Sequence, residues 1–232
     1  MGTITAVNLN NLYWLGRYTE RVFTTLNAFF AYHDRMVDVD ENAYKAYLKK
    51  LCIPDIYENQ NDFLKKYVFD KNDMNSIASN LDRALGNAIV LREEIKTPSL
   101  SYLQMASDKL GKIPGTDKLR FDLLPVRDYI YAFWGSIDDN MTNSESNQII
   151  HFGKLVERTD LYLRLEASEE RTSSELSSLL KIIPEYMGTK ISLSKSDYDF
   201  LCSADIKKEN YQRILSAIEK ITEVNSGETS SV

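Results

Sequence analysis

Two segments far apart in the chain, residues 12–21 and 149–158, carry the same combination of small, basic and acidic residues. Each segment has apolar residues, a glycine, a base, two spacers, a glutamate and an arginine. The members of this combination are Gly16, Arg17, Glu20 and Arg21 in the first segment and Gly153, Lys154, Glu157 and Arg158 in the second. Because a guanidinium group can form two parallel hydrogen bonds with a carboxylate, these residue types predict either paired charges or a site for an anionic group.

The spacing of the two glycines indicates close packing between helices. In a helix, Gly16 lies one turn before Glu20 on the same face, and Gly153 has the same relation to Glu157. A glycine inside a helix costs about 1 kcal/mol relative to alanine, so its presence at matching places needs a structural reason. We therefore expect a neighbouring helix to approach the backbone closely at Gly16 and at Gly153.

The charges of the two segments complement each other. Arg17 lies four residues before Arg21, so the two arginines are neighbours of like charge and favour an additional anion. If the two helices pack as a pseudo-symmetric pair, Arg21 can reach Glu157 and Arg158 can reach Glu20. This reciprocal pairing, which satisfies both signs of charge across the interface, is the central structural hypothesis.

Three interpretations of the charged residues remain open. They could form pairs on helix surfaces, each worth roughly 0.3 to 0.5 kcal/mol. They could instead form an interior network that fixes how the helices assemble, or a network that also binds an anionic ligand such as a phosphate or carboxylate. Repetition with glycine in register favours an interior network over surface pairs.

Residue types for several other kinds of chemistry are missing. The sequence has two histidines, His33 and His151, so a metal site built on paired histidines is not expected. His151 occupies the place of Trp14 in its segment, which favours a packed or hydrogen-bonded imidazole. The sequence has no phosphate-binding loop, dinucleotide-binding fingerprint or nucleophile elbow. We therefore expect no metal and no cofactor, and the absence of a complete catalytic motif argues against an enzyme without excluding one.

The elements that position these residues are predicted to be helices. Apolar residues recur three and four positions apart almost everywhere, and no alternating run of β-branched residues appears. The sequence thus predicts an all-α fold, a single bundle of about seven to nine helices with the two repeat helices in its core. The expected helices cover residues 7–37, 42–52, 61–69, 75–95, 98–113, 117–141, 145–167, 172–188 and 205–224. We expect one domain over residues 1–224 and a flexible tail over residues 225–232.

Composition and charge narrow the class of protein. The chain has 232 residues, of which 43% are hydrophobic and 27% charged, as is typical of a soluble globular protein. Its net charge of -6 repels nucleic acid and anionic lipid, and no stretch is apolar over the length of a membrane span. Cys52 and Cys202 lack the spacing of a disulfide framework, which predicts free, partly buried thiols and a cytoplasmic location. The sequence makes no prediction about the oligomeric state.

The repeated segments resemble those of the alpha-E family, a bacterial helical domain named for its Glu-Arg motifs. Residues 11–21 are similar to the opening signature of that family, and residues 153–160 are similar to a later one. Gly135 followed by Met141 resembles the stretch before the later signature. The resemblance covers most of residues 8–165. A middle element is matched by Ala84, Asn87, Ala88, Arg92 and Glu93, which adds Arg92 and Glu93 to the candidate charge network.

The chain departs from the family pattern near that middle element. Leu85, Gly86 and Ile89 occupy places where the family often has charged residues, and residues 141–143 lack an expected arginine. These departures weaken the expectation of an intact active surface around the middle helix.

The resemblance also implies a functional setting. The family is encoded beside or fused to unusual ATP-grasp proteins, near transglutaminase-like and proteasome-like peptidases. This setting implies an accessory partner of an ATP-grasp ligase that helps to make or trim a modified peptide. The alternative is an enzyme or a bundle that binds a small anionic ligand and uses the Glu-Arg cluster as its site.

Overall fold

Stretches with apolar residues spaced three and four apart form helices throughout a computed structural model of the chain, and the all-α prediction is confirmed. The structure describes residues 5–141, 145–187, 191 and 193–221. Its helices are α1 (Ala6–Asp38), α2 (Ala43–Leu51), α3 (Gln60–Phe69), α4 (Ile77–Val90), α5 (Arg92–Gly111), α6 (Leu119–Asn140), α7 (Glu145–Arg164), α8 (Glu169–Tyr186), α9 (Lys195–Ser203), the short 3-10 helix η1 (Lys208–Asn210) and α10 (Tyr211–Glu219). The described residues contain no β-strand, although Met187 and Ile191 form an isolated bridge.

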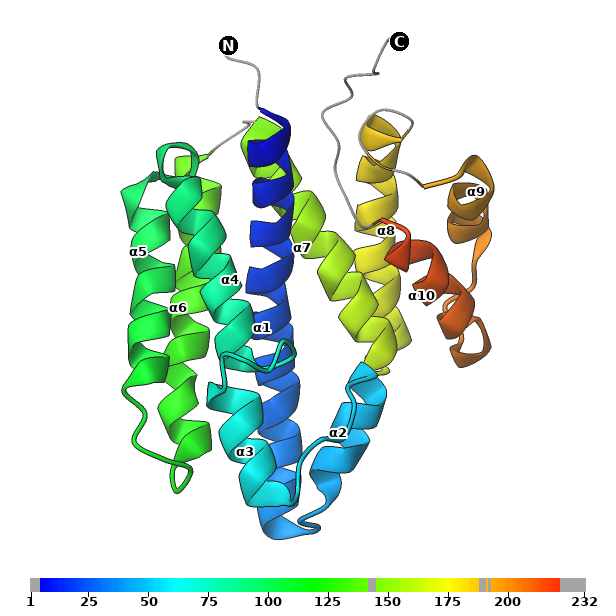
Figure 1. Cartoon of the computed structure of the whole chain (residues 1–232). Helices are drawn as coiled ribbons and strands as arrows, with labels where there is room; N and C mark the ends of the chain where they lie inside the picture. Colours follow the sequence, from blue (N-terminus) through cyan, green and yellow to red (C-terminus); the bar gives the residue numbers. More distant parts are fainter. Residues whose placement is uncertain (1–4, 142–144, 188–190, 192, 222–232) are drawn as a thin grey trace.

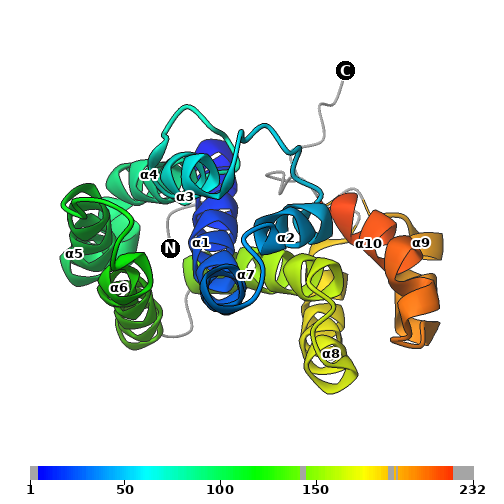
Figure 2. The same ribbon diagram turned by 90° about the horizontal axis from the view of Figure 1, so that it is seen from below.

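Helix α1 lies at the centre of the arrangement (Figures 1 and 2). Helices α4, α5 and α6 lie on one side of it, while α7 crosses it and leads to α8, α9 and α10 on the other side. Helix α2 lies between the lower part of α1 and α10 (Figure 2). The most extensive contact between elements joins α1 and α7, whose N-to-C directions are roughly parallel (Figure 1).

The length and apolar face of α1 explain its central position. The Thr5 side chain caps its first turn by accepting a hydrogen bond from the backbone N–H of Asn8. With 33 residues the helix is about 50 Å long, enough to run through the bundle. Its fully buried apolar side chains include Leu12, Leu15, Val22, Leu26 and Phe29. Because α7 makes its most extensive contact with this buried helix, the two helices that carry the repeated segments are neighbours in the core.

The region between α4 and α5 differs from the prediction of one helix over residues 75–95. Helix α4 ends at Val90, and the first residues of α5 are separated from the rest by Lys96, whose φ of 66° is not helical. Pro98 has no N–H to donate to the carbonyl four residues earlier, so the regular part of α5 starts beside it. The expected start of a helix at Pro98 agrees with this break.

The start of α8 also differs from the prediction. The helix begins at Glu169 rather than at Thr172, and the Ser168 side chain caps it by accepting a hydrogen bond from the Arg171 N–H. Two acidic residues in the first turn, Glu169 and Glu170, favour this earlier start because they lie near the positive end of the helix dipole. The hydroxyl of Thr172 donates instead to the Ser168 carbonyl.

The C-terminal part contains one helix more than expected. Residues 195–203, for which no helix was predicted, form α9, where the Ser194 side chain accepts a hydrogen bond from the Asp197 N–H as a helix cap. The predicted helix over residues 205–224 begins only at Tyr211, after η1. The expected interruption at residues 142–144, the expected helix end at Gly188 and the expected tail over residues 225–232 lie outside the described residues.

Two other expectations concern the surface of the molecule. Cys52 and Cys202 are free, as expected, but both are exposed, so the expected partial burial is wrong. No described helix is both long enough and apolar enough to cross a membrane.

Candidate functional site: the glutamate–arginine network

Helices α1 and α7 touch each other at their two glycines. The backbone of Gly16 lies against the Ile150 carbonyl group, and the backbone of Gly153 lies against the Tyr13 carbonyl group. A β-carbon at either glycine would overlap the carbonyl oxygen of the facing helix. The predicted close approach is therefore present, and it explains why a residue that weakens an isolated helix stands at both places.

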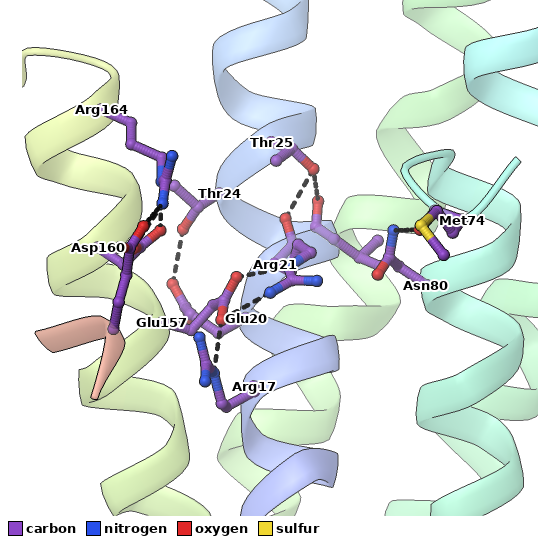
Figure 3. Close-up of polar contacts among 12 residues, drawn as sticks. Arg17, Glu20, Arg21, Thr24, Thr25, Met74, Asn80, Glu157, Asp160 and Arg164 are labelled. Carbon is purple, nitrogen blue, oxygen red and sulfur yellow. Dashed lines mark hydrogen bonds and ion pairs between the residues drawn. The ribbon is translucent and has the colours of Figure 1, made fainter. Parts of the chain in front are cut away.

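The first half of the charge network surrounds Glu157, whose side chain is fully buried. Arg17 donates from Nε to Oε2 of Glu157 at 2.8 Å. Arg21 donates from Nε to Oε1 at 2.5 Å and from Nη2 to Oε2 at 3.1 Å. Figure 3 shows both arginines reaching from α1 toward this one carboxylate of α7. The predicted Arg21–Glu157 pair is present, and Glu157 also supplies the anion that the neighbouring arginines were expected to need.

The second half of the network surrounds Glu20, which is equally buried. Arg158 donates from Nε to Oε1 at 2.7 Å and from Nη2 to Oε2 at 2.9 Å, which is the predicted forked pair. The Thr24 hydroxyl donates a further bond to Oε1 at 2.7 Å. Arg158 also contacts Glu175 of α8 at 3.4 Å. The interpretation of the repeat as exposed surface pairs is therefore wrong.

The two buried glutamates have opposite pKa shifts. Burial alone would raise the pKa of Glu157, but the charges of Arg21 and Arg17 outweigh burial and lower the pKa to about 2. Burial dominates at Glu20 and raises its pKa, although Arg158 and Thr24 oppose the shift. Two arginines thus hold Glu157 firmly ionised, whereas a single arginine pairs with Glu20.

Lys154 belongs to the Glu20 side of the network. Its ammonium group lies 4.0 Å from the centre of the Trp134 ring of α6, a cation–π contact. Burial, followed by the nearby charge of Arg158, lowers the pKa of Lys154. One turn earlier, His151 lies with its Nε2 2.8 Å from Oδ1 of Asp138, so the expected hydrogen-bonded imidazole is confirmed.

Arg92 and Glu93 are not part of this network, which corrects their predicted grouping with it. They form an ion pair with each other at 3.3 Å, and their side chains are 70% and 90% exposed. The reason is the end of α4 at Val90, which places both residues in a separate turn instead of on the buried face of a continuous helix.

Four further residues of the network, Tyr13, Asp160, Arg164 and Glu219, were missed by the sequence analysis. Arg164 donates from Nε to Oδ2 of Asp160 at 2.8 Å and from Nη2 to Glu219 of α10 at 2.5 Å. Tyr13 accepts a hydrogen bond from Arg17 at 3.4 Å. Helical spacing could have identified two of these residues from the sequence. Asp160 and Arg164 follow Glu157 by three and seven residues, so they share its helix face.

A cavity of about 360 Å³ lies beside the Glu157 half of the network. Its lining includes three guanidinium groups, from Arg17, Arg21 and Arg164, together with the carboxylates of Glu157 and Asp160. Guanidinium groups with unused donors suit a carboxylate or phosphate. No group of three or more histidine, cysteine, aspartate or glutamate side chains in the described part of the chain could hold a metal ion.

Comparison with known proteins finds a family match over most of the chain. Residues 7–187 match the model of a family described as a predicted alpha-helical domain with a conserved ER motif. The match includes both Glu20-Arg21 and Glu157-Arg158, and it ends before α9 and α10. No curated protein and no solved structure matches the chain significantly.

Proposed function

The chain belongs to the Alpha-E family, and from this premise we propose that it is an accessory partner of an ATP-grasp peptide ligase in modified-peptide metabolism. One observation carries the non-catalytic part of this proposal. Both glutamates of the repeated Glu-Arg dipeptides, Glu20 and Glu157, are fully buried and accept hydrogen bonds through both of their oxygens.

Such glutamates suit a scaffold better than acid–base chemistry. A general base needs access to its substrate and a pKa near the working pH. Glu157 lines the cavity, but both of its carboxylate oxygens accept hydrogen bonds from Arg17 and Arg21, and these arginines lower its pKa to about 2, far below a working pH of about 7. The network therefore serves to hold α1 against α7 in one geometry, and the ATP-grasp ligase as partner follows from the family resemblance described above.

Native co-purification tests this role. The full chain, carrying an affinity tag, is captured from its own cells, and the retained proteins are identified by mass spectrometry against a tag-only control. We expect an ATP-grasp protein to be enriched and the purified chain alone to leave ATP unchanged. ATP turnover by the purified chain alone, or no enrichment of an ATP-grasp protein above the control, would contradict the proposal.

The arginine-lined cavity favours a second candidate function, the binding of a small anionic ligand. Arg17 and Arg21 share the single negative charge of Glu157, so this end of the cavity has a surplus of positive charge. A ligand that binds only the folded state raises the melting temperature by mass action. Malonate should therefore stabilise the protein more than sodium chloride at equal ionic strength. Substitution Arg21→Gln should remove this difference; an unchanged difference would exclude the cavity as its source.

A further inference from the structure

A second cavity adjoins the arginine-lined one. It has a volume of about 450 Å³ and lies between α2, the end of α7 and α10, with Lys49, Lys50 and Lys208 in its lining. Cys52 and Arg164 line both cavities, so the two are neighbours. We call the cavity beside Glu157 the inner chamber and the second cavity the outer chamber. Each has a volume within the range of ligand-binding pockets.

The outer chamber repeats the charge pattern of the inner one. In the inner chamber, Arg17 and Arg21 share Glu157. In the outer chamber, the carboxylate of Glu166 lies 3.6 Å from the ammonium group of Lys50 and 2.8 Å from that of Lys208. One carboxylate between two cations leaves a surplus positive charge in each of these two clusters, and a ligand with two separated negative charges would match both. Elsewhere in the inner chamber Arg164 pairs with Asp160 and Glu219, so the lining of that chamber as a whole holds three basic and three acidic side chains.

The outer chamber has further positive charge available. Lys49 lines it and makes no ion pair with any described residue, and its side chain is exposed. Over both chambers, six basic side chains oppose four acidic ones, although the whole chain has a net charge of -6. The basic members are Arg17, Arg21, Lys49, Lys50, Arg164 and Lys208, and the acidic members are Glu157, Asp160, Glu166 and Glu219. This local reversal of sign draws an acidic ligand to this part of the surface.

The acidic residues in the lining decide between kinds of anionic ligand. A polyphosphate offers hydrogen-bond acceptors but no backbone donors, so it would face Asp160, Glu166 and Glu219 with like charge. A peptide offers N–H donors for those carboxylates and carboxylates for the arginines and lysines. We propose that the two chambers together bind an acidic peptide, with one carboxylate in the inner chamber and another in the outer chamber. This proposal rests on the second candidate function and names its ligand class.

Fluorescence anisotropy with labelled pentaglutamate and the full-length protein tests the proposal. The variant Lys49→Gln/Lys208→Gln removes two charges from the outer chamber, and both side chains are exposed, so the substitutions leave the buried core unchanged. The matched control Lys112→Gln/Lys181→Gln removes the same charge from exposed positions outside both chambers. We expect the first variant to weaken pentaglutamate binding about tenfold and the control to leave it within about twofold. The uncharged peptide pentaglutamine should not compete.

Three results would overturn the proposal. One is an equal loss of affinity in the two double variants, which would indicate the overall charge as the cause. Another is displacement of the labelled peptide by tripolyphosphate at a lower concentration than by unlabelled pentaglutamate, which would favour a polyphosphate ligand. The third is stabilisation by malonate, dependent on Arg21, without any binding of pentaglutamate. That third result would leave the small-anion function intact and remove only the peptide as its ligand.

Discussion

Glu20 and Glu157 are equally inaccessible to solvent, but they are unequally paired across the contact between α1 and α7. Glu157 accepts hydrogen bonds from Arg17 and Arg21, whereas Glu20 accepts them from Arg158 and from the hydroxyl of Thr24. The pKa of Glu157 is therefore lowered while that of Glu20 is raised. Matched substitutions should show this difference as a difference in stability.

Substitution Glu157→Gln should lower the free energy of unfolding by about 3 kcal/mol at pH 7, because the shift of the Glu157 pKa from 4.5 to about 2 corresponds to that energy. The folded-state pKa lies below the unfolded value, so this contribution is present above pH 4.5. It is lost as the pH falls from 4.5 toward 2. Urea titrations of both proteins at several pH values measure the difference.

Substitution Glu20→Gln is the matched control for this prediction. The pKa of Glu20 is raised by burial, so its ionised form is not favoured by folding, and the neutral glutamine should cost less than at Glu157. Equal losses for the two variants at pH 7 would show that the second arginine on Glu157 adds no stability.

The glycines provide a second prediction. Gly16→Ala and Gly153→Ala should each lower the free energy of unfolding by roughly 3 kcal/mol, because the new methyl group overlaps a carbonyl oxygen of the facing helix. Gly86→Ala is the control: Gly86 lies inside α4 with open space around it, so alanine should stabilise the protein by up to about 1 kcal/mol. Thermal or urea unfolding of the three variants checks the expected loss of stability at Gly16 and Gly153 and the expected gain at Gly86. A stabilising Gly16→Ala would contradict the close helix contact.

Local spacing predicted much of this architecture. The reciprocal pairs Arg21–Glu157 and Arg158–Glu20 follow from two matching helical segments whose charges complement each other. The addition of Arg17 to Glu157 does not follow from spacing, because it depends on how closely the helices approach and on which rotamer the side chain takes. Volume and shape of the two chambers depend in the same way on where α2 and α10 pack against α7.

The errors of prediction have local causes. The end of α4 at Val90 was missed because apolar spacing continues through residues 75–95, whereas the break at Lys96 agrees with the predicted helix start at Pro98. Arg92 and Glu93 were placed with the charge network because of the family resemblance of the middle element, although both side chains are exposed. Helix α9 was missed because its short sequence is polar, yet Ser194 and Asp197 are the capping residues that start it.

Arginine substitutions separate the network from surface pairs. Arg158→Ala should lower the free energy of unfolding by about 3 to 5 kcal/mol, because it leaves Glu20 buried without its guanidinium partner. Arg158→Lys should recover only part of this loss, since an ammonium group cannot form the fork. Arg92→Ala, at an exposed pair, should stay within about 0.5 kcal/mol of the parent. Urea titration distinguishes these outcomes, and a loss below 1 kcal/mol for Arg158→Ala would remove the network as a source of stability.

Tyr13 connects the network to the C-terminal part of the structure, and this contact provides the last prediction. Its hydroxyl donates to the Ile221 carbonyl at 2.5 Å and accepts a bond from Arg17. Tyr13→Phe leaves the carbonyl of the buried Ile221 without this donor, so the free energy of unfolding should fall by about 1 to 2 kcal/mol at pH 7. Tyr131→Phe, at an exposed tyrosine, should change it by less than about 0.5 kcal/mol.

The pH dependence of the Tyr13 variant distinguishes loss of this hydrogen bond from a change in packing. Burial raises the pKa of Tyr13 to about 12, from 10, although Arg17 opposes the shift. A raised folded-state pKa means that the contribution of the neutral hydroxyl is present below pH 10 and is lost as the pH rises toward 12. The difference in unfolding free energy between the parent and Tyr13→Phe should therefore shrink over this range. A constant difference from pH 7 to pH 12 would indicate that the substitution acts through packing alone.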